Sequence, residues 1–129
     1  MDPLQLLIQL TMRNEKDIDE HLMTLFSLVL SLKPTHVLEL GVRTARSTLA
    51  FLLATQYTGS RLTSVDIEEM RPDFSFPEEM KKNWQFIKKD ALAFLERDFS
   101  IILAARKKSE PILVYIDDWH DGLHVKKEL

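Results

Sequence analysis

The sequence predicts an α/β fold whose core is a parallel β-sheet. Two observations carry this prediction: four short apolar runs have strand character, and most of them are separated by segments with helical spacing. Strands that alternate with helices pair in parallel through right-handed crossovers. The chain has 129 residues, which fits one domain, and 45% of them are apolar, which is enough for a core.

Two helices are expected before the first strand. Residues 17–33 repeat apolar side chains at helical spacing, and the pair Lys33-Pro34 ends the pattern. The apolar positions of this repeat are Ile18, Leu22, Leu25, Phe26, Val29 and Leu30. A shorter apolar helix is expected at residues 4–12.

The rest of the chain alternates between strands and helices. The expected elements are, in order, a strand at 35–41, a helix at 44–57, strands at 61–67 and 84–90, a helix at 91–99, a strand at 111–117 and a helix from residue 123. Thr44 is the expected N-cap of the helix at 44–57, and Gly59 lies just past its end. Residues 68–82 hold two Pro and mixed charge, so we expect an irregular excursion with one helical turn.

Composition narrows the class of protein. A net charge of −3 gives no general attraction to nucleic acid, and the absence of Cys excludes disulfides and thiolate sites. The N-terminus lacks the basic flank of a secretory signal. The longest apolar stretch, residues 22–32, is 11 residues long, which is too short to cross a bilayer. We expect a cytoplasmic, soluble protein that acts on a small molecule, not on nucleic acid or a membrane.

Candidate binding residues follow the first two strands, because ligands bind at the carboxyl ends of such sheets. Gly41 lets the backbone approach a ligand, and Glu39 can accept a hydrogen bond from an ammonium or hydroxyl group. Asp66 comes 27 residues after Glu39 (66 − 39) and can hold both hydroxyls of a ribose. A nicotinamide dinucleotide fold would need G-x-G-x-x-G, but Arg43 and Ala45 follow Gly41 here. A ligand without phosphates therefore fits better.

The stretch HVLELGVRTARSTLAFL resembles the first motif of class I S-adenosylmethionine-dependent methyltransferases, with Ala45 at the usual second Gly. LTSVDI is similar to their second motif and FIKKDALAFL to their third, so the resemblance covers residues 35–125. The resemblance implies that S-adenosylmethionine contacts Glu39, Gly41, Val42, Ser47, Asp66, Ile67, Asp90, Ala91, Asp118 and Trp119. Asp66 would bind the ribose, and Asp90 and Ala91 would lie near the adenine. Ala45 is a mild change if its φ is negative and a costly one if its φ is positive.

The stretch YIDDWHDG, after the fourth strand, resembles the fourth motif of catechol-type, metal-dependent O-methyltransferases. That resemblance implies that Asp117 is a catalytic Mg²⁺ ligand and His120 the catalytic base. It also places Asp118 near the adenine and makes Trp119 a wall of the site. The spacing of Asp117, His120 and His124 is equally similar to the cephalosporin-hydroxylase-like group of the same fold. The residues do not separate the two resemblances.

Plainer roles remain open for the same residues. Glu39 and Asp90 can each cap a helix, and Asp66 can be an ordinary turn acid. Trp119 can serve packing, and His36 belongs to no motif. By ligand type, a zinc site also remains open on Asp117, His120 and His124.

Two functions of different class follow. The first is an O-methyltransferase for a small-molecule hydroxyl, or the cofactor-binding half of one. The second is a non-catalytic nucleoside-binding or interaction module derived from the same fold. The resemblance implies a three-layer, Rossmann-like fold in which residues 1–129 form one domain, with strand order 3-2-1-4 and an apparent truncation after the fourth strand. The strand at 111–117 then lies at an edge, so we expect a missing C-terminal segment or a homodimer.

Overall fold

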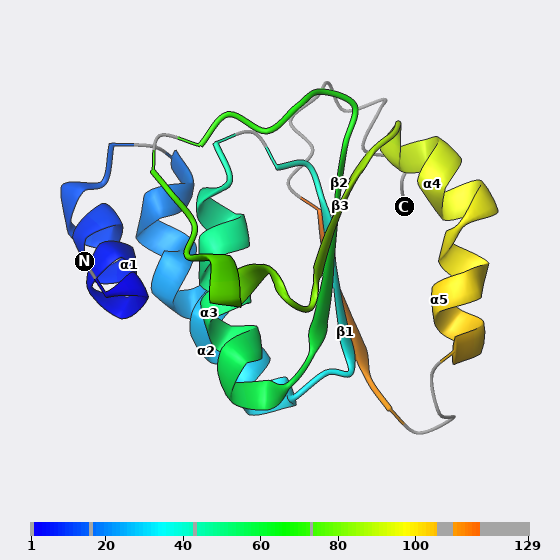
Figure 1. Cartoon of the computed structure of the whole chain (residues 1–129), viewed down its shortest axis with the longest axis horizontal. Coiled ribbons are helices and arrows are strands. Elements are labelled where there is room, and N and C mark those ends of the chain that lie inside the picture. The colour runs from blue at the N-terminus through cyan, green and yellow to red at the C-terminus, as the bar shows by residue number, and fades with distance from the viewer. Residues whose placement is uncertain (1, 16, 43, 73, 106–109, 117–129) are drawn as a thin grey trace.

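A computed structural model describes the chain except residues 1, 16, 43, 73, 106–109 and 117–129. Its centre is a sheet of four parallel strands in the order β3-β2-β1-β4 (Figure 1). The strands are β1 (His36–Leu40), β2 (Arg61–Asp66), β3 (Trp84–Lys88) and β4 (Ile112–Ile116). The predicted parallel sheet and its strand order are confirmed.

Helices cover both faces of this sheet, as Figure 1 shows. One face carries α1 (Pro3–Arg13), α2 (Leu22–Leu32) and α3 (Arg46–Thr58), and the other carries α4 (Ala91–Arg97) and α5 (Phe99–Ala105). There are also two short 3₁₀ helices: η1 (Asp17–His21) lies between α1 and α2, and η2 (Glu78–Lys81) lies between β2 and β3. The expected three-layer architecture with N-terminal helices is therefore confirmed.

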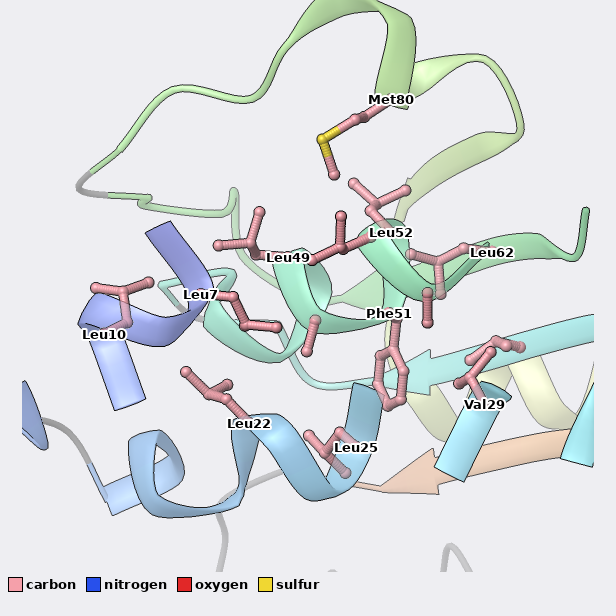
Figure 2. Packing of buried hydrophobic residues seen from close by; sticks show 14 residues of the cluster. Leu7, Leu10, Leu22, Leu25, Val29, Leu49, Phe51, Leu52, Leu62 and Met80 are labelled. Carbon is pink, nitrogen blue, oxygen red and sulfur yellow. The ribbon is translucent and has the colours of Figure 1, made fainter. Parts of the chain in front are cut away.

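The larger core lies between the sheet and the N-terminal helices. Residues 46–55 of α3 are all buried, because this helix is packed between the sheet and α2. Figure 2 shows Leu25 and Val29 of α2 beside Phe51 of α3. On the opposite face of the sheet, Leu38 of β1 packs toward Phe94 of α4 in a second cluster. Successive residues of β1 thus serve opposite cores, as the pleat of a strand requires.

The start of α3 corrects one expectation. Thr44 is not the N-cap, because the helix begins at Arg46 and is preceded by Ala45 in the left-handed conformation. The end of α3 agrees with the expectation. Gly59 has a φ of 75°, and its N–H donates to the carbonyl of Thr55 at 2.8 Å. Glycine adopts this left-handed conformation without the steric penalty of a side chain.

Other boundaries differ by a few residues. The helix expected at 17–33 is divided into η1 and α2, and the one expected at 91–99 ends at Arg97 as α4. Helix α5, which begins at Phe99 and continues to Ala105, was not expected. The helical turn expected within 68–82 is η2. Figure 1 shows the segment before η2 passing from β2 over the end of the sheet to the side of α3. The helix expected from residue 123 lies outside the described residues.

Two other expectations concern the open edge of β4 and the location of the protein. Within the described residues, β4 pairs with β1 alone, and Val114 in the middle of β4 is 39% exposed. In the part of the chain that the structure describes, no helix is both long and apolar enough to cross a bilayer. Association through the β4 edge and a cytoplasmic location stay predictions.

Candidate functional site

The loop after β1 is joined to the end of β2. Gly41 has a φ of 94°, and its N–H donates to the carbonyl of Val65 at 2.8 Å. The next amide, that of Val42, donates to Oδ2 of Asp66 at 2.8 Å. The other carboxylate oxygen of Asp66 accepts the N–H of Glu68 at 3.1 Å. The structure thus brings the predicted Gly41, Val42 and Asp66 together at the carboxyl ends of two neighbouring strands.

Ala45 closes this loop in a conformation that favours glycine. Its φ is 63°, its side chain is fully buried, and its N–H donates to the carbonyl of Val42 at 2.9 Å. A left-handed backbone costs a residue with a Cβ about 1–2 kcal/mol. The Ala at the second Gly position is therefore the costly case, and surrounding contacts must hold it in place.

Glu39 lies at the centre of a buried hydrogen-bond network. Its carboxylate accepts the hydroxyls of Ser47 at 2.5 Å, Thr48 at 2.6 Å and Ser64 at 2.8 Å. The indole N–H of Trp84 donates to the Ser64 hydroxyl at 3.0 Å. The Glu39 side chain is fully buried, so this network offsets the desolvation of its charge and ties α3 to the sheet. Cofactor contacts for Glu39 and Ser47 stay predictions.

After β3, Asp90 has the helix-capping role that the sequence left open. Asp90 is the N-cap of α4, and its Oδ2 accepts the N–H of Ala93 at 3.1 Å. Ala91 is buried as the first residue of this helix. Ile67, directly after β2, is 60% exposed. Capping by Asp90 leaves further acceptor capacity on its carboxylate, so it does not compete with an adenine contact.

Sequence reasoning missed a buried ion pair next to the loop. Nη1 of Arg46 lies 2.8 Å from Oδ2 of Asp19, and both side chains are almost fully buried. The carboxylate of Glu15 lies 4.0 Å from the same guanidinium. A signal was present, since Asp19 precedes Leu22 by three residues and so falls on the apolar stripe of the helical pattern. A charged residue on such a stripe indicates a buried partner.

The predicted catalytic cluster lies outside the described residues. This holds for Asp117, Asp118, Trp119, His120 and His124. Among the residues that the structure does describe, no group of three His, Cys, Asp or Glu side chains is placed to hold a metal ion. The last described residue of β4, Ile116, pairs with Leu40, directly before Gly41. The metal and the base therefore stay predictions.

A cavity lies between the sheet and helices α4 and α5, and much of its lining comes from the amino ends of β1 and β2. Its volume is about 950 Å³, and its walls include Lys33, His36, Arg61 and Phe94. Nε2 of His36 lies 2.7 Å from the hydroxyl oxygen of Thr63. Burial and the neighbouring Arg61 guanidinium lower the pKa of His36 below its ordinary value of 6.5. None of the predicted cofactor residues that the structure describes lines this cavity, so the candidate site stays at the carboxyl end of the strands, where sheet topology places ligands.

Solved structures of CmcI share this fold. The CmcI structure described as "Mg-SAM" aligns with a TM-score of 0.54 and 17% identity over 88% of this chain and 46% of its own. The one described as "SAH" aligns with a TM-score of 0.55 and 17% identity over 83% and 50%. An apo structure aligns with 0.53 and 19% over 88% and 46%. The chain spans about half the length of these proteins.

The chain belongs to the family described as Rhamnosyl O-methyltransferase/CmcI, whose model matches residues 12–129. The resemblance to methyltransferases that the motifs predicted is therefore confirmed. The match includes the loop after β1, the end of β2 and the residues that follow β4. No curated protein matches the chain.

Proposed function

We propose that this chain is the S-adenosylmethionine-binding domain of an O-methyltransferase that acts on a hydroxyl group of a small molecule. The observation that carries the proposal is the junction between Val42 and Asp66 in a chain of this family. It fixes a loop and a carboxylate at the edge where parallel sheets bind ligands. We treat residues 1–129 as this one domain.

The residues at this edge fit a nucleoside. Asp66 is partly exposed, and each of its carboxylate oxygens has two lone pairs. It can therefore accept ribose hydroxyls while it holds the amides of Val42 and Glu68. The exposed apolar side chain of Ile67 is suited to packing against a purine face. Asp90, at the end of β3, offers an acceptor for the exocyclic amine of adenine.

The same residues do not fit a dinucleotide. A G-x-G-x-x-G fingerprint that starts at Gly41 has Arg43 and Arg46 at its second and third glycine positions. The side chain of Arg46 is buried against Asp19, so it is not available as a phosphate ligand. The loop therefore lacks the bare backbone that a pyrophosphate needs for close approach.

S-adenosylmethionine, when bound, supplies an activated methyl group. The chain must place an acceptor hydroxyl in line with it and remove the proton from that hydroxyl. We propose that His120 accepts the proton, because imidazole titrates near neutral pH. We propose that Asp117 holds a Mg²⁺ ion, which lowers the pKa of the hydroxyl. Both residues follow β4 in the sequence and lie outside the described part of the chain.

Calorimetry of the full chain with S-adenosylhomocysteine and with NAD tests the binding half of this proposal. We expect the former to bind and NAD not to bind, and tighter binding of NAD would overturn the assignment. Transfer of a labelled methyl group to a panel of phenols and sugars tests the catalytic half. Binding without transfer to any acceptor would instead support a non-catalytic module.

A further inference from the structure

Asp19 makes two hydrogen bonds through one oxygen atom. Its Oδ2 accepts Nη1 of Arg46 at 2.8 Å and the backbone N–H of Glu15 at 3.0 Å. Asp19 belongs to η1, between the two N-terminal helices, whereas Arg46 is the first residue of α3. The carboxylate therefore joins the N-terminal helices to the start of the central helix.

Arg46 occupies a position that is unfavourable for a cation. The first turn of a helix carries the positive end of the helix dipole, and burial removes the water that would solvate the charge. Only 1% of its side chain is exposed, and Asp19 is fully buried. The buried charge of Arg46 is therefore tolerated at the start of α3 only while its hydrogen bond to Asp19 is kept.

The start of α3 is also the end of the loop after β1, residues 41–45, which we call the candidate cofactor loop. Arg46 directly follows Ala45, which has the left-handed backbone and donates its N–H to Val42. The beginning of the loop is held by the amide of Val42 on Asp66. The loop is thus anchored to β2 at its start and to η1 at its end, and a strained residue lies between the two anchors.

We propose that Asp19 is a positioning residue for this loop. Through Arg46, it holds Ala45 in the left-handed conformation and thereby keeps the Val42 amide directed at Asp66. The inference rests on the proposed function, since the loop matters for S-adenosylmethionine binding only if that ligand binds here. It also implies that the N-terminal helices and the cofactor loop are mechanically linked.

Amide hydrogen exchange in the unliganded full chain tests the link directly. In Asp19→Asn, we expect the amides of Val42 and Ala45 to exchange at least about tenfold faster than in the wild type. The amide of Leu53, in the middle of α3, should change much less. The matched control is Glu20→Gln, which removes a charge from the exposed neighbour on η1 and should leave all three amides unchanged.

Calorimetry with S-adenosylhomocysteine supplies the second readout. At a temperature where every variant is folded, Asp19→Asn should weaken binding about tenfold, and Glu20→Gln should not. If Asp19→Asn does not fold, Arg46→Lys takes its place. It keeps the charge but loses the planar fork of the guanidinium, and it should show the same pattern to a smaller degree.

The outcomes separate this inference from the proposed function. Equal acceleration of the Val42, Ala45 and Leu53 amides, with unchanged affinity, would show that the ion pair only stabilises the fold and would overturn the inference. Absence of binding by the wild type would overturn the proposed function, while the exchange rates would still decide whether Asp19 positions the loop.

Discussion

Oδ2 of Asp66 and the amide nitrogen of Val42 lie 2.8 Å apart, so the loop after β1 is attached to the end of β2. The carboxylate that we propose for ribose binding is therefore also a structural anchor of its own site. Changes at Asp66 should affect both the affinity for the ligand and the order of the loop.

Replacement of Asp66 by Ala should weaken binding of S-adenosylhomocysteine by about 1–3 kcal/mol, the scale for losing a charged hydrogen-bond partner. Calorimetry measures the change. Glu69→Ala is the control, because it removes the same charge three residues later from a side chain that is 74% exposed and 3.7 Å from Lys88. Equal losses in both variants would mean that the affinity reflects overall charge and not a contact by Asp66.

Glu39→Gln should lower the free energy of unfolding by about 1–3 kcal/mol. Hydroxyls from Ser47, Thr48 and Ser64 all donate to this buried carboxylate, and an amide nitrogen cannot accept the hydrogen bond of the oxygen that it replaces. Urea denaturation followed by circular dichroism measures the loss. Glu68→Gln, at an exposed position beside Arg71, should leave the midpoint unchanged. A midpoint shared by both variants would contradict the structural role of Glu39.

Ala45→Gly and Ala50→Gly form a matched pair, because both alanines are fully buried in or beside α3. Ala45 has a φ of 63°, whereas Ala50 lies within the helix, where glycine is unfavourable. We expect Ala45→Gly to be at least about 1 kcal/mol more stable than Ala50→Gly. Thermal and urea unfolding give the comparison. The same loss in both variants would show that the left-handed backbone of Ala45 carries no strain.

Lower pH should destabilise the fold through His36. Its pKa is lowered in the folded state by burial and by Arg61, so the unfolded chain binds the proton more readily. The contribution of neutral His36 to stability is fully present above the unfolded value of 6.5 and is lost as pH falls toward the folded pKa.

The check is the melting temperature as a function of pH in the wild type and in His36→Gln. The variant should show a flatter dependence in this range. A parallel curve for His36→Gln would exclude His36 as the titrating group.

Removal of Mg²⁺ by EDTA should lower methyl transfer if Asp117 is the metal ligand that the motif implies. Asp117→Ala should abolish the response to Mg²⁺, because the ion loses a hard oxygen ligand. Asp121→Ala, which removes the carboxylate four residues later in the stretch YIDDWHDG, should retain the response. An enzyme that is active and indifferent to EDTA would leave Asp117 without a metal role.

The sequence predicted those features that depend on neighbouring residues or on the order of motifs. Gly59 and Asp90 were correctly placed at helix ends, since capping depends on local residue type. Ala45 was not foreseen as an N-cap, because its left-handed backbone is imposed by the surrounding loop. The pair of Asp19 and Arg46 joins residues 27 apart, so it exists only once the helices have packed.

The order of the strands also bears on when the sheet forms during synthesis. Ser64 joins Glu39 across only 25 residues, whereas the contact of Thr35 with Pro111, where β1 meets β4, spans 76. Close contacts form before distant ones, because short loops close at a smaller loss of chain entropy. Because synthesis runs from the N-terminus, β1, α3, β2 and β3 also leave the ribosome before β4 does. Until then, the edge of β1 that pairs with β4 has no partner strand. During that interval the unpaired edge of β1 is open to mispairing with other strands.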